Sequence, residues 1–229
     1  MQQVRIMTID GPSGSGKGTV SRAAARALGW ALLDSGALYR LVALAGRRAG
    51  ISLDDGPRLG QLALQLDIRF GSDAAGGERV WLDGGEVSAA IRTEEAGNDA
   101  SRVAALPVVR AALLERQRRF AVPPGLVADG RDMGTVVFPQ AEVKIFLTAS
   151  ASERAMRRHK QLKEKGVAAN LAALSLEIAE RDLRDTSRAI SPLVASADAT
   201  LLDTTGMSVD LVVERVLKVA RGRLSREID

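Results

Sequence analysis

The chain has 229 residues, no cysteine and a net charge of +4, and its length fits one large domain or one core with small inserted subdomains. The missing thiols exclude disulfides and thiolate metal sites, and without a bilayer-spanning apolar run or an apolar signal segment the simplest expectation is a cytoplasmic protein with no membrane partner. The basic balance favours an anionic partner, and because aromatic residues make up only 3% of the chain, small phosphorylated ligands are favoured over nucleic acid.

Hydrophobic patterning predicts short buried strands separated by helices. The core strands are expected at 4–9, 30–33, 125–128, 142–147 and 199–202. The main helices are expected at 19–28, 37–49, 57–66, 93–105, 107–120, 151–165, 170–188 and 208–221. Between 67 and 92 the pattern changes to short strands at 68–70, 80–82 and 86–87, with glycine turns at 71, 76–77 and 84–85. This order indicates an α/β fold, in which a small antiparallel sheet is inserted into a five-stranded parallel sheet with helices on both faces.

The first strand leads into a glycine-rich loop that reads G-x-x-x-x-G-K-G-T. Its residues are Gly11, Pro12, Ser13, Gly14, Ser15, Gly16, Lys17, Gly18 and Thr19. Glycines let successive backbone N–H groups point at a phosphate, and the N-terminus of the following helix adds positive charge there. Strand, loop and helix together are the context of a P-loop, so a chance turn is disfavoured. Gly18 stands where GTPases and motor ATPases carry a hydroxyl, and this G-K-G-T form resembles nucleoside monophosphate kinases.

Polar residues follow every predicted core strand. They are Asp10, Asp34 and Ser35, Asp129 to Asp132, Thr148, and Asp203. Because the carboxyl ends of parallel strands share one edge of the sheet, we expect these groups beside the P-loop. In the Asp129-Gly130-Arg131-Asp132 segment, a carboxylate can hold Mg²⁺ through water and the arginine can clamp a phosphate. That interpretation is favoured over an exposed Asp-Gly turn.

The helix predicted at 170–188 has an apolar stripe that becomes charged. Leu171, Leu174 and Ile178 follow helical spacing, and the next positions of the stripe are Arg181, Asp185 and Arg188. Three ionised groups do not enter a core without partners, so this face can line a polar cleft where the arginines meet phosphates. Alternatively, the helix turns out into solvent and Arg181–Asp185 is an ordinary i,i+4 pair. The pattern alone does not decide between the two.

Three further sets of residues carry weaker signals. Arg40 lies early in its helix and within reach of the loop, but Asp34 and Ser35 before it also read as simple helix caps. Arg110 stands in an apolar setting, on the helix that follows the one carrying Ser101. The last set, Arg154, Arg157 and Arg158, belongs either to a solvated helix face or to a helix pair that closes over a nucleotide.

Five stretches in order resemble the bacterial cytidylate kinase family, within the nucleoside monophosphate kinase group. They are G-P-S-G-S-G-K-G-T (11–19), L-D-S-G-A-L-Y-R (33–40), A-S-R-V-A-A-L-P-V-V-R (100–110), D-G-R-D-M-G-T-V-V-F-P (129–139) and R-D-L-R-D-T-S-R-A-I-S-P-L (181–193). The resemblance implies a three-layer P-loop NTPase fold and transfer of the γ-phosphate of ATP to CMP or dCMP, with Mg²⁺. The small sheet at 67–92 also resembles an insertion of the bacterial enzymes, and Ser35 stands where threonine is common.

The resemblance also implies roles for individual residues. Residues 11–19 and Arg157 would bind ATP, and Lys17, Arg131 and Arg181 would act in catalysis. The residues expected around CMP are Ser35, Arg40, Ser101, Arg110, Asp129, Arg131, Asp132, Arg181, Asp185 and Arg188. No direct metal ligand is expected; Mg²⁺ would come with ATP and be held through water near Thr19 and Asp129. The resemblance favours the cleft interpretation of the face that carries Arg181, Asp185 and Arg188.

We therefore expect a single P-loop kinase domain over 1–229, present as a monomer. Its core would be formed by 1–60, 121–150 and 195–222, its acceptor-binding insertion by about 61–120 and its lid by about 151–190. Another small P-loop kinase, acting on UMP, AMP or shikimate, is the main alternative. A basic nucleic-acid-binding P-loop ATPase and a nucleotide sensor without turnover are less favoured, since sparse aromatic residues and several cleft arginines oppose them.

Overall fold

The structure is a computed structural model that describes residues 4–73, 77–164 and 166–225. It divides into two compact units. The first unit contains the chain up to Asp34 and again from Arg118 onward, and the second is Ser35–Gln117. These two units are defined by how the chain packs. The functional division into core, insertion and lid stays a prediction.

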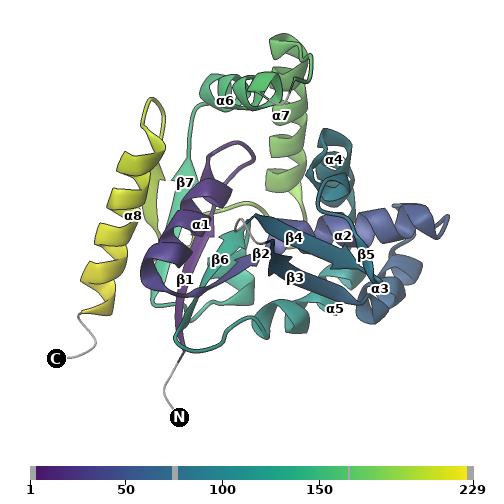
Figure 1. Ribbon diagram of the computed structural model, residues 1–229, viewed down its shortest axis with the longest axis horizontal. Coiled ribbons are helices and arrows are strands. Elements are labelled where there is room, and N and C mark those ends of the chain that lie inside the picture. The colour runs from purple at the N-terminus through teal and green to yellow at the C-terminus, as the bar shows by residue number, and fades with distance from the viewer. Residues whose placement is uncertain (1–3, 74–76, 165, 226–229) are drawn as a thin grey trace. The chain divides into compact units, whose positions relative to one another are not determined.

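The first unit is built on a five-stranded parallel sheet in the order β2-β6-β1-β7-β8 (Figure 1). The strands are β1 (Arg5–Asp10), β2 (Ala31–Asp34), β6 (Gly125–Gly130), β7 (Val143–Thr148) and β8 (Thr200–Asp203). In the register of the sheet, Asp10 pairs with Gly130, Asp34 with Asp129, and Thr148 with Asp203. The predicted polar strand ends therefore do share one edge of the sheet.

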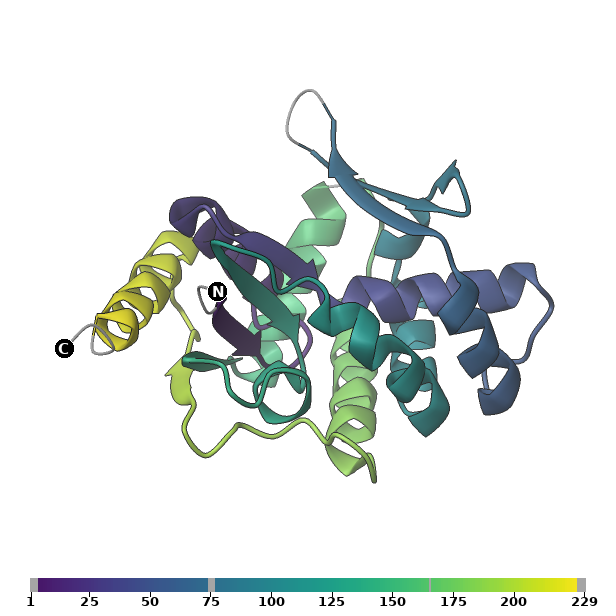
Figure 2. The ribbon, with the colours of Figure 1, turned by 90° about the horizontal axis from the view of Figure 1, so that it is seen from below.

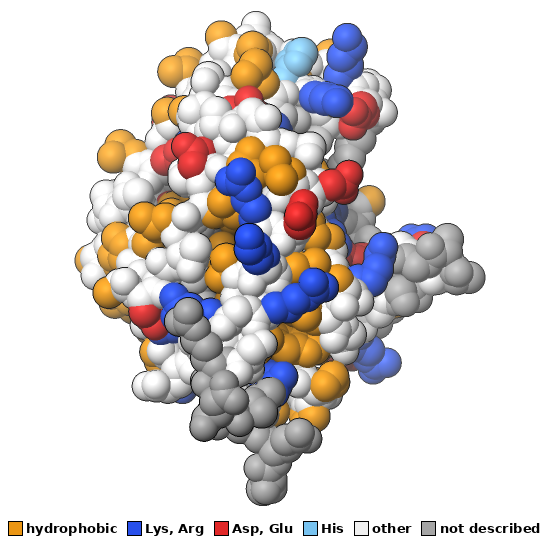
Figure 3. All heavy atoms as spheres, turned by 90° about the vertical axis from the view of Figure 1, so that its left-hand side faces the viewer, with side chains coloured by type: hydrophobic (Ala, Val, Ile, Leu, Met, Phe, Trp, Pro, Cys, Tyr) orange, Lys and Arg blue, Asp and Glu red, His pale blue; other side chains and the backbone are white. Residues whose placement is uncertain are grey.

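The helices of the first unit are α1 (Lys17–Leu28), α6 (Ala151–Glu164), α7 (Leu171–Ser187) and α8 (Val209–Leu224). Figures 1 and 2 show α8 running beside α1, and both helices pack on a core of aliphatic strand residues. That core contains Met7, Ile9, Val127, Val143 and Ile145, with Val20, Ala24, Val212 and Val216 from the two helices. On the face that carries α8, basic side chains are interspersed with acidic and hydrophobic ones (Figure 3).

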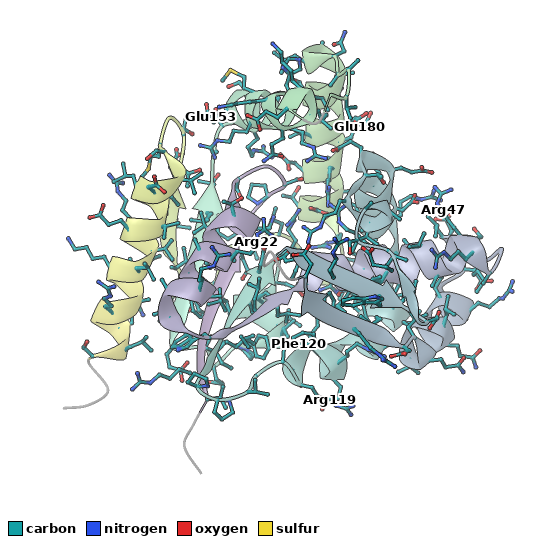
Figure 4. The ribbon with its side chains drawn as sticks, in the orientation of Figure 1. Arg22, Arg47, Arg119, Phe120, Glu153 and Glu180 are labelled. Carbon is teal, nitrogen blue, oxygen red and sulfur yellow. The ribbon has the colours of Figure 1, made fainter. Side chains whose placement is uncertain are left out.

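The second unit combines helices with a three-stranded antiparallel sheet in the order β3-β4-β5. Its elements are α2 (Ser35–Arg48), α3 (Gly56–Gln65), β3 (Ile68–Ser72), β4 (Glu78–Leu82), β5 (Gly85–Glu86), a 3₁₀ turn (Ala90–Arg92), α4 (Glu94–Val103) and α5 (Pro107–Arg118). Helices α2 and α4 pack together, and the guanidinium of Arg47, labelled in Figure 4, binds both carboxylate oxygens of the buried Asp99.

The predicted α/β class, with its parallel sheet and inserted antiparallel sheet, is confirmed. The boundaries differ by a few residues: α1 begins at Lys17 and α2 at Ser35, because the loop and the strand pass directly into each helix. A π-helical turn at Met133–Val137 was not predicted. Two predictions fall on residues outside the described ones: the helix end at 165 and the first glycine of the turn at 76–77. Among the described helices, none has the length and apolar character needed to cross a membrane.

Gly125 tests how tightly the sheet packs, because a Cβ there would lie 2.5 Å from Trp30 Cδ2 and 2.9 Å from the Arg5 carbonyl oxygen. We predict that Gly125→Ala lowers the free energy of unfolding by about 1–3 kcal/mol, measured by urea denaturation. The control is Gly222→Ala in α8, where nothing lies within 4 Å of the added methyl. That change should stabilise the protein by about 0.5–1 kcal/mol, since alanine favours the helix. Equal effects at the two sites would contradict the prediction.

Candidate active site

The glycine-rich loop fits closely against the neighbouring strand. A Cβ at Gly11 would lie 2.1 Å from the carbonyl oxygen of Leu147 in β7, so only glycine fits. Gly16 caps α1 with φ of 89°, a left-handed conformation that glycine adopts without strain. The loop therefore ends directly in a helix N-terminus, where backbone N–H groups and the helix dipole favour an anion.

Lys17 is the first residue of α1, and its half-buried side chain folds back over the loop. Its Nζ donates to the carbonyl oxygen of Pro12 at 3.3 Å. Burial and the positive charges of Arg131 and Arg181 together lower the pKa of Lys17 to about 7, while Asp129 and Asp34 oppose the shift. Positive groups therefore crowd this point beyond what the nearby carboxylates offset, which is the electrostatic condition for binding phosphate.

Asp129 lies near the end of β6, against the P-loop glycine Gly18. A Cβ at Gly18 would lie 3.2 Å from Asp129 Oδ2, closer than side chains normally pack. Among the described residues, the buried Asp129 Oδ1 has no hydrogen-bond partner. Burial raises the pKa of Asp129 to about 6, although Lys17 opposes the shift. A buried carboxyl oxygen without a partner is unusual in a folded protein, so Asp129 fits a group that binds next to the loop.

Asp10 connects the end of β1 to the segment after β6. Its two carboxyl oxygens accept from the backbone N–H groups of Met133 at 2.9 Å and Gly134 at 2.8 Å. A Cβ at Gly134 would lie 2.8 Å from Thr8 Oγ1, so the π-helical turn sits directly on β1. These contacts hold in place the chain segment that carries Arg131 and the buried Asp132.

The charged face of α7 turns into the unit and meets Arg131. Arg131 Nε donates to Asp185 Oδ2 at 2.9 Å, and the Asp185 side chain is 4% exposed. Burial alone would raise the pKa of Asp185, but Arg131, Arg181 and Arg188 hold it below its ordinary value. Of the two interpretations left open by the pattern, the structure therefore supports the inward one. The predicted inward position of Leu171 is wrong: it is 43% exposed, because it is the first residue of α7, whereas Leu174 and Ile178 are buried.

Arg154 on α6 connects the P-loop to α7. Its buried guanidinium donates to the carbonyl oxygens of Ala149 and Ser13, both at 3.0 Å, and to both carboxylate oxygens of Asp182, at 3.0 and 2.5 Å. The sequence placed Arg154 in a charged cluster without assigning it a role. The i,i+3 spacing of Arg154 and Arg157 on α6 was the available signal, since it puts both on one helix face.

Arg157 reaches the P-loop from the same face of α6. Its Nη1 donates to the Ser15 carbonyl oxygen at 3.3 Å and to Thr204 Oγ1 at 3.0 Å, and its Nε donates to Glu153 at 2.9 Å. In Figure 4, Glu153 marks α6 and Glu180 marks α7, and these two helices pack against each other. Sequence reasoning did not single out Thr204, which follows β8 and donates to the Thr148 carbonyl oxygen at 3.0 Å.

The second unit holds the other predicted binding residues. Arg40 Nη1 donates to the carbonyl oxygens of Ile91 at 2.8 Å and Thr93 at 3.2 Å, and Ser101 is buried on α4. Arg110 donates to the Ala104 carbonyl oxygen at 3.1 Å and lies over the ring of Tyr39, 5.6 Å from its centroid. Its apolar setting in the sequence reflects this buried cation–π contact.

Ser35 begins α2 and is also in the second unit, where its hydroxyl donates to Gln117 Oε1 at 2.7 Å. The structure thus gathers Lys17, Asp129, Arg131 and Asp185 within the first unit, and Ser35, Arg40, Ser101 and Arg110 within the second. Gln117 was missed because a lone glutamine near the end of a helix carries no sequence signal.

A parallel sheet whose first strand runs into this loop, with Lys17 at the helix start, defines a P-loop nucleotide-binding protein. Residues 7–222 match the family model described as Cytidylate kinase, and the chain belongs to this family.

Similar proteins span nearly the whole chain. A cytidylate kinase of Pseudomonas savastanoi pv. phaseolicola is 59% identical over 93% of this chain and 93% of its own length. A cytidylate kinase of Marinomonas sp. is 57% identical over 94% of this chain and 95% of its own length. The solved structure of a gluconokinase from Sinorhizobium meliloti aligns with a TM-score of 0.47 and 19% identity, covering 99% of this chain and 97% of that one.

Arg154 should matter for stability as well as for position. We predict that Arg154→Met lowers the free energy of unfolding by about 2–4 kcal/mol, because Asp182 and two carbonyl oxygens lose their donor. Chemical denaturation measures the change, and Lys160→Met at an exposed site on the same helix is the control, which should leave stability unchanged. Similar losses of unfolding free energy in both variants would show that the Arg154 contacts do not stabilise the protein.

Asp10 should make stability depend on pH. Burial raises its pKa from 3.8 to about 7, so the folded protein keeps this proton where the unfolded chain has lost it. Because the native state then binds more protons, the free energy of unfolding should fall as pH rises from about 4 to 7. Asp10→Asn removes this part of the slope, although its amide also faces an N–H donor and lowers stability at every pH. Asp129 contributes in the same direction and remains in the variant. Denaturation at several pH values with an unchanged slope would contradict the prediction.

Proposed function

We propose that the chain transfers the γ-phosphate of ATP to CMP or dCMP, giving ADP and CDP or dCDP. The observation that carries the proposal is the group formed by Lys17, Arg131 and Asp185 beside the P-loop, in a chain of the cytidylate kinase family. Phosphoryl transfer needs alignment and neutralisation of charge rather than a nucleophile on the protein. An excess of cations at a helix N-terminus meets that need.

The donor nucleotide would bind residues 11–19. The backbone N–H groups of the loop and Lys17 would hold its phosphates, and Arg157, which already donates to the Ser15 carbonyl oxygen, would lie beside it. Mg²⁺ would shield the phosphate charges, held through water near Thr19 and Asp129. The buried Asp129 Oδ1, which has no hydrogen-bond partner among the described residues, supports this position.

The acceptor nucleotide would be recognised through its phosphate, its sugar and its base. Arg40, Arg131 and Arg181 are assigned to phosphate, and Asp185 to the sugar. Ser35, Ser101, Arg110, Asp132 and Arg188 are assigned to the cytosine. Ser35, Ser101 and Asp132 are polar residues at buried positions, which suits recognition of a polar base away from water. The monomeric state, the cytoplasmic location and the preference between CMP and dCMP stay predictions.

An acceptor panel tests the proposal. With ATP fixed, a coupled assay of ADP release should show turnover with CMP and dCMP and much less with UMP, AMP or shikimate. Lys17→Ala should lower kcat with CMP by about 10³-fold, because the phosphate charge loses its cation. Arg26→Ala, an exposed arginine in the last turn of the same helix, should leave kcat unchanged. Preference for another acceptor in the panel would overturn the assignment of CMP, and a near-normal Lys17→Ala rate would overturn the role of the loop lysine.

A further inference from the structure

Ser35 and Gln117 form a buried hydrogen bond that closes the second unit. The Ser35 hydroxyl donates to Gln117 Oε1 at 2.7 Å, and the two residues are 3% and 1% exposed. They are also the first and last residues of that unit, at the points where the chain enters and leaves it. The bond therefore joins the two ends of the unit, and α2 and α5 pack around it.

A second contact between the same two helices lies beside it. Tyr39, one turn after Ser35 on α2, packs against Arg110, which is two turns before Gln117 on α5. Arg110 is itself fixed by its bond to the Ala104 carbonyl oxygen. One face of α5 thus holds one face of α2 at two places, so the Ser35 side chain has a fixed orientation.

This arrangement fixes the polarity of the Ser35 hydroxyl. A serine hydroxyl has one proton to donate and two lone pairs that accept. Here the proton is committed to Gln117, and turning it away would leave a buried amide oxygen without a donor. Toward a ligand, Ser35 can then only accept a hydrogen bond.

We propose that Gln117 is a positioning residue that selects cytosine over uracil by holding Ser35 as an acceptor. Cytosine carries an amino donor at C4, where uracil carries a carbonyl acceptor. An acceptor-only hydroxyl matches the amino group and opposes the carbonyl group, which has no proton to share. The inference rests on the proposed function, in which Ser35 contacts the base.

Replacing Gln117 should change selectivity in a way that simple damage does not. In Gln117→Met the Ser35 proton has no fixed acceptor, so the hydroxyl can rotate and donate to the uracil carbonyl. The value of kcat/KM for UMP should rise about tenfold, while that for CMP falls by no more than a few fold. The ratio of the two, measured with ATP fixed, should fall by at least about tenfold. A purely structural role would lower both values together.

Further variants separate the explanations. Gln117→Glu keeps an acceptor at the same place and should keep the ratio, whereas Gln61→Met, the same change at an exposed position of α3, should alter neither value. Ser35→Ala should itself lower the ratio, and Gln117→Met should have no further effect on the ratio in that background.

The outcomes that overturn the inference are specific. An unchanged ratio in Ser35→Ala overturns it even if Gln117→Met does not fold, and a further change of ratio in the double variant shows that Gln117 acts by another route. Failure of the proposed function looks different, because the unaltered protein would then not phosphorylate CMP at all.

Discussion

The buried carboxyl group of Asp10 is the contact on which the first unit's site depends. It ends β1 immediately before the P-loop, and it binds the two backbone N–H groups with which the π-helical turn begins. One side chain therefore fixes both the start of the phosphate loop and the segment that carries Arg131 and Asp132. Because the two strands are already in register from Arg5 to Asp10, this bond adds no new pairing. It sets the direction in which the chain leaves the sheet.

The other charged side chains of the site are connected to this segment through a chain of contacts. Arg131 extends to Asp185 on α7, and Arg154 ties α7 and α6 back to the loop through Asp182 and the Ser13 carbonyl oxygen. Lys17 lies within this group and loses part of its affinity for a proton, because burial and Arg131 both disfavour its charge. A polyanion relieves this repulsion when it binds, so the positive charges that are unfavourable together become favourable around phosphate.

Strands, helices and the polar edge of the sheet could be predicted from the sequence, because each depends on local periodicity and on a general property of parallel sheets. The P-loop could be predicted because its glycines are required by the backbone, as Gly11 shows against Leu147. Strand order could not, since no local pattern records which strands pair. Nor could the π-helical turn, which follows from two hydrogen bonds to Asp10, more than 120 positions earlier in the chain. The charged face of α7 points inward because it contacts Arg131. That residue lies outside the helix, so helical spacing alone cannot reveal the contact.

Gln117 shows why the residues of a site can be predicted while the residue that orients one of their side chains is missed. Ser35 is visible in sequence because its neighbours form a motif, but the motif does not state whether its hydroxyl donates or accepts. That is settled by a hydrogen bond between residues 82 positions apart, which the fold brings together where the second unit begins and ends. The same bond closes the unit and orients the proton. In the proposed function, selectivity between bases that differ by a donor and an acceptor then depends on the packing of α2 and α5 as well as on the groups that contact the base.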